Sequence, residues 1–268
     1  MAAMKAIRKA LTIAGSDSGA GAGIQADLKT FAAHGVYGTS AITAVTAQNT
    51  VGVSAICALS PKLVAAQIDA VVSDIGADAV KTGMLANAAI IEIVARKLRQ
   101  HRLENVVVDP VMVATSGDLL IKKNAVAALR ARLIPLAWVV TPNLPEAEEL
   151  TGMKLHGTSD IEEAARRIVG MGARSVIIKG GHRKGPAVDL FYDGKKFRAL
   201  YAPRIRTTNT HGTGCTFSAA IAANLAQGKK LETAVALAKQ FITQAFRRVF
   251  PVWTGHGPVH HFHRFWKG

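Results

Sequence analysis

The residues best suited to chemistry lie in the glycine-rich segment 207–218, which reads TTNTHGTGCTFS. Gly212 and Gly214 permit a tight turn, and the run of small residues from Ser218 onward favours a helix directly after it. The first backbone N–H groups of such a helix lack partners within the helix, and the helix dipole adds positive charge there. The segment therefore predicts an anion site, for which phosphate is the expected ligand.

Cys215 is expected in the first turn of that helix, where the pKa of a thiol is commonly lowered. A base beside an anion-binding turn suits phosphoryl transfer to an alcohol, because that reaction depends mainly on positioning and on charge stabilisation. The alternative is an inert, buried cysteine behind a glycine-rich helix cap. The segment alone supports both interpretations.

Polar residues at the ends of apolar runs are further candidates for a site. Gln48 closes a β-branched run, and it is either a turn residue or a contact to a ligand. Asn143 and Glu146 stand at an expected helix start, where they either cap the helix or orient magnesium through water. Lys179 precedes two glycines at the end of another run, so it either contacts phosphate or lies solvated in a turn.

Two common nucleotide-binding fingerprints are missing from the sequence. The glycine loop 15–23 does not fit the G-x-G-x-x-G pattern, because Ile24 occupies the third glycine place and no acidic residue follows at the expected distance. No Gly-Lys-Ser or Gly-Lys-Thr of a phosphate-binding P-loop occurs either. A Rossmann cofactor site is therefore excluded, and an ATP site must use another device.

Short apolar runs alternate with amphipathic segments and predict the elements that must position these residues. Strands are expected at 9–14, 38–48, 53–59, 79–84, 105–112, 138–142 and 175–178. Helices are expected at 24–35, from Ser60-Pro61, at 87–101, from Asn143, up to Gly172 after a Ser159 and Glu162 capping box, at 218–226 and at 231–246. Such alternation predicts a parallel sheet buried on both faces, with ligands at the carboxyl ends of its strands.

Three of the candidates fall at such strand ends, namely Gly83, Met84 and Asp109. Met84 and Val111 are equally compatible with an ordinary core position. The Asp193-Gly194 pair between runs 188–192 and 196–202 predicts a hairpin, which adds an antiparallel ribbon late in the fold. The expected fold class is α/β.

Length and composition bound the protein class. With 268 residues and 49% hydrophobic residues, the chain can bury a substantial core, and no linker or repeat divides it, so residues 1–268 are expected to form one domain. The two cysteines, Cys57 and Cys215, lie far apart and point to a reducing, cytoplasmic compartment. No apolar run is long enough to cross a bilayer, and no signal peptide is evident at the start. Neither a membrane nor secretion is expected.

The net charge of +15 raises nucleic acid as a partner, which would place the protein in a different functional class. The basic residues, however, are scattered along the chain in twos and threes, and no nucleic-acid-binding module is recognisable. We therefore expect no nucleic-acid partner and interpret the charge as a general attraction for small anions. The histidine-rich stretch 256–263 lacks the cysteine or carboxylate spacing of a metal site, and none is expected there.

Seven motifs in the order of the chain carry a resemblance to a known family. They are GSDSGAGAGIQAD at 15–27, TAQNT at 46–50, KTGM at 81–84, DPVM at 109–112, TPNLPE at 141–146, KGGH at 179–182 and NTHGTGC at 209–215. Together they resemble the hydroxymethylpyrimidine/phosphomethylpyrimidine kinases of thiamine biosynthesis, over nearly the whole chain. The ending GPVHHFH at 257–263 is similar to that family as well.

The resemblance implies a ribokinase-like, three-layer α/β/α fold with a mostly parallel central sheet. It also implies two successive phosphorylations by ATP, first of a pyrimidine hydroxymethyl group and then of the resulting monophosphate, with small-molecule substrates, magnesium and a homodimer. Cys215 corresponds to the proposed base, and the backbone of Gly212, Thr213 and Gly214 would stabilise the phosphoryl group. Gln48 would bind the aminopyrimidine edge, since an amide offers both a donor and an acceptor.

The resemblance assigns the remaining roles by motif. The residues expected to surround the substrate ring are Gly15, Ala22, Asp27, Met84 and Val111. The residues expected at the nucleotide are Lys179, Thr210 and Asn143, and those expected to hold magnesium, through water, are Asn143, Glu146 and Asp109.

The sequence departs from the family pattern in two places. Thr115 stands where a lysine often precedes Ser-Gly, which removes an expected phosphate contact, and Ala20 stands where glycine is usual. The cysteine at position 215 favours the pyrimidine and pyridoxal kinase branch, because most ribokinase-like relatives have aspartate there. A pyridoxal kinase of the same fold is therefore the nearest alternative, and a basic nucleic-acid-binding protein is a remote one.

Overall fold

The structure, a computed structural model, describes residues 6–113, 123–181, 187–248 and 254–266. Its strands are β1 (Lys9–Asp17), β2 (Tyr37–Gln48), β3 (Val53–Ala58), β4 (Ala79–Thr82), β5 (Val106–Val108), β6 (Val139–Val140), β7 (Val176–Ile178), β8 (Ala187–Tyr192) and β9 (Phe197–Ala202). Its helices are α1 (Gly23–Ala33), α2 (Pro61–Asp74), α3 (Ala88–Gln100), α4 (Lys123–Ala128), α5 (Leu144–Thr151), α6 (Thr158–Gly170), α7 (Thr213–Ala226) and α8 (Leu231–Arg247). Helix α4 continues into a π-helical turn (Leu129–Leu133) and a 3₁₀ turn (Ile134–Leu136).

The strands of the described residues form one nine-stranded sheet in the order β3-β2-β1-β4-β5-β6-β7-β8-β9. Strands β2, β1, β4, β5, β6 and β7 pair in parallel, whereas β8 and β9 form the antiparallel ribbon expected around Asp193-Gly194. Strand β3 also pairs antiparallel, at the opposite edge. The expected fold class is confirmed, while the antiparallel β3 edge was not predicted.

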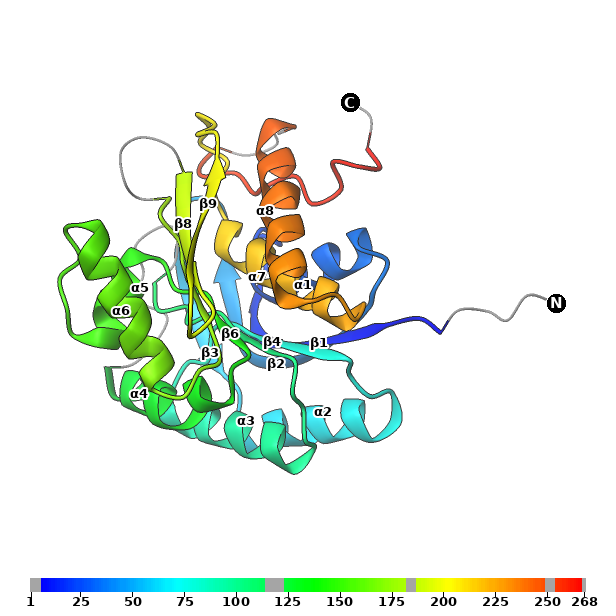
Figure 1. Ribbon diagram of the computed structural model, residues 1–268. Coiled ribbons are helices and arrows are strands. Elements are labelled where there is room, and N and C mark those ends of the chain that lie inside the picture. The colour runs from blue at the N-terminus through cyan, green and yellow to red at the C-terminus, as the bar shows by residue number, and fades with distance from the viewer. Residues whose placement is uncertain (1–5, 114–122, 182–186, 249–253, 267–268) are drawn as a thin grey trace.

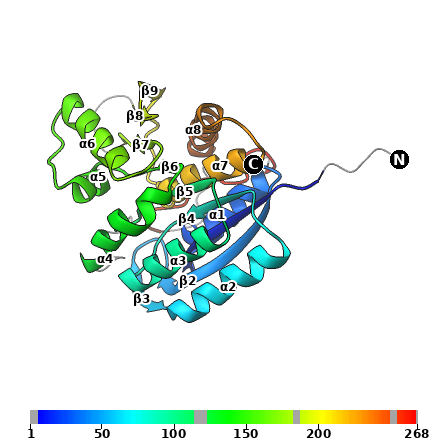
Figure 2. The ribbon, with the colours of Figure 1, turned by 60° about the horizontal axis from the view of Figure 1, so that its bottom comes forward.

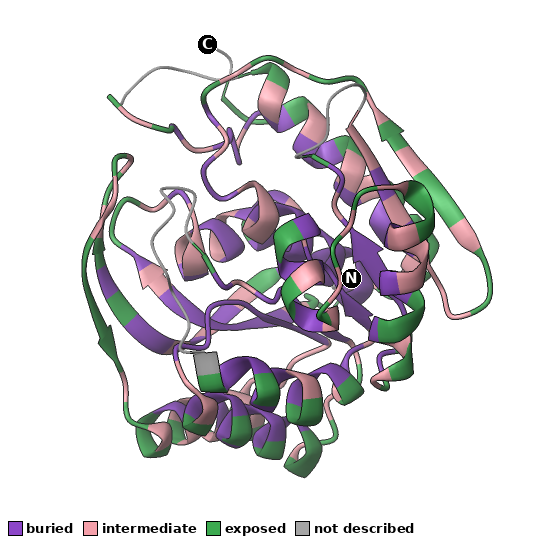
Figure 3. Ribbon diagram, turned by 90° about the vertical axis from the view of Figure 1, so that its left-hand side faces the viewer, coloured by how far each residue is buried: buried purple, intermediate pink, exposed green. Residues whose placement is uncertain are grey.

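Helices cover both faces of the sheet (Figures 1 and 2). One face carries α2, α3, α4, α5 and α6, whose apolar side chains pack with Leu11, Ile13 and Val80. The other carries α1, α7 and α8, which pack with Ala10, Val107 and Val139. Buried positions line the sides of the helices that face the sheet, and exposed ones face outward (Figure 3). The sheet is thus buried on both faces, as its apolar strands require.

The cap expected at Ser60 is present at the start of α2. Ser60 accepts a hydrogen bond from the Leu63 N–H with Pro61 at the first helical position, and Asn87 caps α3 in the same way. The Ser159 capping box was wrong. Helix α6 begins at Thr158, and the Asp160 carboxylate accepts from the Gly157 N–H at 2.9 Å.

Two further features shape the sheet around the site. The register of β1 against β2 shifts between Ala14 and Ser16, where a bulge lies beside Gly15. Strand β5 spans only three residues of the predicted run 105–112, because it ends before Asp109-Pro110. Within the described ranges, no helix combines the length and the hydropathy needed to cross a membrane.

Candidate active site

A cavity of about 940 Å³ opens at the carboxyl ends of the parallel strands. It brings together fourteen of the fifteen residues expected from the sequence, although they come from seven separate motifs. The lining includes Gly15, Ala22, Gln48, Met84, Asp109, Val111, Asn143, Glu146, Lys179, Thr210, Gly212, Thr213, Gly214 and Cys215. Asp27 is the exception. Thr115 and His182 lie outside the described residues.

The glycine-rich segment of the sequence does begin a helix, and it packs backbone to backbone against the loop before α1. Gly212 is the N-cap of α7 and has φ = 73°, in the left-handed region. A Cβ atom on Gly212 would lie 1.8 Å from the Gly21 carbonyl oxygen, and one on Gly21 would lie 2.3 Å from the His211 ring. Only glycine fits at these contacts. The loop before α1 and the loop before α7 therefore lie in direct contact and together form one wall of the cavity, which we call the phosphate wall.

The backbone donors of this wall are not equivalent. The Thr213 N–H donates to the Thr210 carbonyl at 3.2 Å, and the Thr213 hydroxyl donates to the same oxygen at 2.6 Å. Both donors of Thr213, its N–H and its hydroxyl, are therefore already used within the loop. The N–H groups of Gly214 and Cys215 follow it in the first turn of α7, where the helix dipole favours an anion.

Cys215 is half-buried at the third position of α7, and its sulfur accepts a hydrogen bond from the Gly23 N–H at the start of α1. Burial raises the pKa of its thiol to about 11, although the positive charge of Lys81 acts in the opposite direction. The expectation of a lowered pKa was therefore wrong. Two helix starts face the sulfur, but desolvation outweighs their effect.

A chain of charges lies behind Cys215. Lys81 is fully buried, with its Nζ 2.9 Å from Asp27 and 3.9 Å from Asp109. Lys179 reaches Asp109 from the other side at 3.2 Å, and a Cβ atom on Gly214 would lie 3.1 Å from its Nζ. Burial lowers the pKa of Lys81, but Asp27 and the other acids around it outweigh burial and raise it, so the ammonium stays charged.

Asp27 does not reach the cavity. Its carboxylate is fully buried on α1, where it accepts hydrogen bonds from Thr12 at 2.6 Å and from Lys81 at 2.9 Å. The expected direct contact with a substrate ring is therefore not supported by its position. Asp27 instead holds Lys81, which does line the cavity.

Asn143 and Glu146 form the capping box of α5. The Asn143 side chain accepts from the Glu146 N–H at 2.8 Å, and the Glu146 carboxylate accepts from the Asn143 N–H at 2.7 Å. Glu146 also lies near Asp109 and Lys179. Burial raises the pKa of Glu146 to about 7, with Lys179 acting in the opposite direction and Asp109 adding to it.

The carboxylates of Asp109 and Glu146 offer the oxygen ligands that magnesium prefers. Asp109 Oδ2 is buried and has no hydrogen-bond partner among the described residues, which leaves a carboxylate oxygen for a hydrated cation. No group of three or more potential ligands of the His, Cys, Asp or Glu type occurs among those residues. Magnesium bound mainly through water and phosphate is what such a site fits, because Mg²⁺ retains much of its hydration shell.

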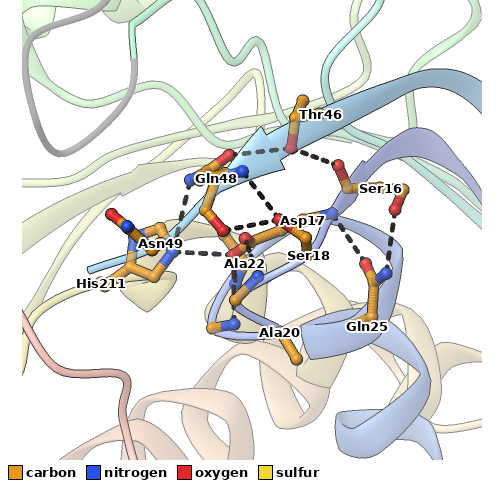
Figure 4. Close-up of polar contacts among 12 residues, drawn as sticks. Ser16, Asp17, Ser18, Ala20, Ala22, Gln25, Thr46, Gln48, Asn49 and His211 are labelled. Atoms are coloured by element: carbon orange, nitrogen blue, oxygen red, sulfur yellow. Dashed lines mark hydrogen bonds and ion pairs between the residues drawn. The ribbon is translucent and has the colours of Figure 1, made fainter. Parts of the chain in front are cut away.

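One end of the cavity contains polar residues that the sequence reasoning missed (Figure 4). Asp17 and His211 form a contact of 2.8 Å, and the Gln48 amide lies 3.5 Å from the same histidine nitrogen. Burial raises the pKa of Asp17, but hydrogen bonds from His211 and from the backbone of Ala22 and Gly19 outweigh burial, so the pKa is lowered. Asp17 and His211 belong to the family-like motifs 15–27 and 209–215, and no other feature of the sequence marked them as site residues.

The opposite end is built by the late ribbon and α8. Lys239 pairs with Asp189 at 2.6 Å, and Asp189 also accepts from the Gly180 N–H at 3.0 Å. Ile205 and Phe246 supply apolar lining there. No motif marked Asp189, Ile205, Lys239 or Phe246, because they come from separate elements with ordinary patterns.

The histidine-rich stretch packs behind the site. His261 is buried, and its Nε2 lies 3.0 Å from the Thr216 hydroxyl of α7. Gly257 accepts from the His211 N–H at 3.0 Å. Burial lowers the pKa of His261 to about 3, with help from the charge of Lys29, so this ring is neutral. The stretch 256–263 therefore packs against the loop before α7 and stabilises that side of the cavity.

Comparisons with known proteins agree with this geometry. A model of the phosphomethylpyrimidine kinase family matches residues 17–260. The chain is 51% identical over 258 residues to the hydroxymethylpyrimidine/phosphomethylpyrimidine kinase of Bacillus subtilis, covering 96% of this chain and 95% of that one. It is 56% identical over 252 residues to the thiamine biosynthesis bifunctional protein ThiED of Geobacter sulfurreducens, covering 94% of this chain but 51% of that protein. The chain thus spans about half the length of the Geobacter protein.

Solved structures show the same fold. The ADP complex of Bacillus subtilis pyridoxal kinase matches with a TM-score of 0.89 and 44% identity, covering 96% of this chain and 98% of that one. The phosphomethylpyrimidine kinase of Clostridium difficile matches with a TM-score of 0.80 and 46% identity, covering 89% of this chain and 99% of that one. Both substrate classes therefore occur among the structural neighbours.

Proposed function

This chain belongs to the phosphomethylpyrimidine kinase family, and from that premise we propose that it is the ATP-dependent hydroxymethylpyrimidine/phosphomethylpyrimidine kinase of a thiamine pathway. It would phosphorylate the hydroxymethyl group of the pyrimidine and then the monophosphate. The observation that carries the proposal is the cavity, in which an amide at one end, a helix start in the middle and a charged end from α8 share one space.

We propose that the substrate ring lies between Gln48 and Met84, with its hydroxymethyl group toward Cys215. The Cys215 thiolate takes the hydroxyl proton, and the oxygen forms a bond to the γ-phosphorus of ATP. The bond between that phosphorus and the bridging oxygen breaks, and ADP leaves with the electron pair. The N–H groups of Gly214 and Cys215 stabilise the transferring phosphoryl group.

The charges behind the cysteine have distinct roles in this proposal. Lys81 favours the thiolate over the thiol, because it is a fixed positive charge at the cavity floor. Lys179 neutralises charge on the nucleotide phosphates, with Thr210 and Asn143 near them. ADP and AMP-PCP complexes of related pyridoxal kinases support ATP as the donor.

Magnesium fits the carboxylates at this place. We propose that Asp109 and Glu146 hold it through water, while the Asn143 oxygen is already engaged in the α5 cap. When bound, magnesium would neutralise the charge of the phosphate oxygens. The protein residues hold the cation and orient its water.

Pyridoxal kinase activity is the second candidate, since structural neighbours in complex with ligands include pyridoxal kinases at 40–44% identity. Gln48 is the residue that distinguishes a pyrimidine substrate from pyridoxal. An amide matches the donor and acceptor on an aminopyrimidine edge, which a pyridine ring lacks. A pyrimidine preference is therefore the one that the site favours.

The test is ADP release with ATP and magnesium on hydroxymethylpyrimidine and, in parallel, on pyridoxal. We expect turnover on the pyrimidine to collapse in Cys215→Ala. We expect Gln48→Leu to reduce it far more than it reduces pyridoxal turnover. Equal losses on both rings would contradict the role of Gln48, and turnover on neither ring by the unmodified protein would contradict the function.

Three broader properties complete the proposal. The chain acts as one kinase domain, supported by the continuous sheet of the described residues. It acts in the cytoplasm, supported by free thiols at Cys57 and Cys215. It acts as a homodimer through the β2–β3 edge, where Val45, Val51 and Ile56 are exposed.

A further inference from the structure

Asp17, His211 and Gln48 form a polar chain at the substrate end of the cavity (Figure 4). Asp17 ends β1, Gln48 ends β2, and His211 precedes α7, so three distant segments meet there. All three side chains line the cavity. The proposed phosphoryl transfer uses neither the aspartate nor the histidine.

The carboxylate of Asp17 acts only as an acceptor. Its Oδ1 accepts from the Gly19 N–H at 2.8 Å, and its Oδ2 accepts from the N–H groups of Gly21 at 3.1 Å and Ala22 at 2.8 Å. These three backbone N–H groups can only donate, and Asp17 is just 2% exposed, so little water competes for its oxygens. In the 2.8 Å contact with Asp17 Oδ2, His211 Nε2 must therefore carry a hydrogen.

The Gln48 amide lies between this Nε2–H and Thr46. Its nitrogen is 3.5 Å from His211 Nε2 and its oxygen is 3.3 Å from Thr46 Oγ1. The Thr46 hydroxyl also donates to the Ser16 carbonyl at the shorter distance of 2.8 Å, which leaves its oxygen as an acceptor. A half-turn of the amide places its oxygen toward His211, where it shares the single Nε2 hydrogen with Asp17, and places its NH₂ group toward the Thr46 oxygen, which accepts.

We propose that Asp17 and His211 are positioning residues that fix the direction of the Gln48 amide, and thereby fix which way round an aminopyrimidine ring enters the site. The edge of such a ring presents an amino donor beside a nitrogen acceptor. It matches a fixed amide in one orientation, and that orientation directs the hydroxymethyl group toward Cys215. This inference rests on the proposed function, and it adds a structural reason why the site selects an aminopyrimidine ring in one orientation.

The test compares His211→Leu, His211→Gln and Gln48→Leu with the double variant His211→Leu/Gln48→Leu. KM for hydroxymethylpyrimidine is measured at saturating ATP, and KM for ATP is measured at saturating hydroxymethylpyrimidine. His211→Leu removes the donor and raises KM for hydroxymethylpyrimidine about tenfold, while kcat and KM for ATP change little. His211→Gln keeps an N–H donor near the same place and recovers most of the loss. The double variant is no worse than Gln48→Leu alone, because the histidine acts through the amide.

Two further variants make the experiment specific. Thr46→Val removes the acceptor for the NH₂ group without touching His211, and it raises the same KM several-fold. It also serves if a histidine variant does not fold. His156→Leu makes the same chemical change at an exposed site outside the cavity and leaves the kinetics unaltered.

The outcomes separate this inference from the proposed function. Additive losses in the double variant would overturn the inference. So would a fall in kcat on both pyrimidine and pyridoxal, since His211 would then merely support the phosphate wall. An unmodified protein without pyrimidine turnover would instead overturn the function itself.

Discussion

At the scale of single residues, the chemistry depends on how burial and charge balance at Cys215. The thiol lies at a helix start, next to the positive end of a dipole, yet burial raises its pKa to about 11. The deprotonated fraction at neutral pH is therefore small. The pKa of a cysteine at a helix start therefore depends on its burial as well as on the helix dipole, and at Cys215 the effect of desolvation is the larger one.

A pH profile tests this directly. If the thiolate is the base, the active form is the deprotonated one, so kcat/KM rises with pH below the pKa of about 11. We expect close to a tenfold rise per pH unit between about pH 7 and pH 9. Residual turnover of Cys215→Ala, measured over the same range, should lose that slope. A flat profile for the unmodified protein would show that another group accepts the proton.

The Lys81 and Asp27 pair makes a second prediction at this scale. Both side chains are fully buried and lie 2.9 Å apart. Asp27→Ala leaves the ammonium without its nearest partner and should lower the free energy of unfolding by about 3–5 kcal/mol. Urea denaturation measures this loss. The double variant Asp27→Leu/Lys81→Met removes both charges and should recover much of it. Equal losses in the two variants would refute the charge argument.

At the scale of single residues, the sequence identified candidate site residues within motifs, but it did not show which side chains contact them in the folded protein. Gln48 and Cys215 stand out because of their type and position. Asp17 and His211 are separated by 194 positions, so their contact follows only from the pairing of β1 and β2 and the packing of α7. Asp27 was assigned to the ring because it shares a motif with Ala22, yet its side chain points to Lys81, behind the cavity.

At the scale of elements, the local signals were the predictable ones. Ser60 with Pro61, Asn87, and Asp193-Gly194 each act within a few residues, and each marks an element boundary that the structure has. The strand order and the antiparallel edge at β3 depend on distant pairings, so no local pattern contained them. The Ser159 cap failed because Asp160 supplies a stronger, charged acceptor one residue later.

The close contact between the Gly21 loop and the Gly212 loop predicts the effect of a substitution at the start of α7. Gly212→Ala places a Cβ atom 1.8 Å from the Gly21 oxygen at a φ of 73°, so the wall must shift. We expect kcat to fall by roughly 100-fold, as for a displacement of about 1 Å at a reacting centre. Gly228→Ala is the matched control, because its φ is 78° but nothing lies within 4 Å of the added atom.

The control should isolate backbone strain from crowding. Gly228→Ala should lower stability by about 1 kcal/mol without changing kcat. Steady-state kinetics and urea denaturation of both variants measure the two effects. Similar kinetics in the two variants would mean that the close approach at Gly21 does not shape the site.

At the scale of the whole molecule, the outer edge of β3, the first strand in the order of the sheet, is the surface best suited to association. Its residues are exposed along nearly the whole strand, and Val45, Val51 and Ile56 present apolar side chains. Edge strands with such side chains favour association. Ile56→Lys should convert a dimer to a monomer in sedimentation velocity. A monomer before the substitution, or a dimer after it, would contradict the proposed use of this edge.

The stretch 256–258 gives the site an order of assembly in time. The His256 N–H donates to the Thr50 carbonyl at 2.9 Å, and Pro258 pairs with His211. The ribosome delivers Thr50 early, and 205 positions separate it from Gly255, which also contacts it. A nascent chain can thus build most of its sheet while the pyrimidine end of the cavity still lacks one wall. A chain interrupted before this stretch therefore has little means to consume ATP.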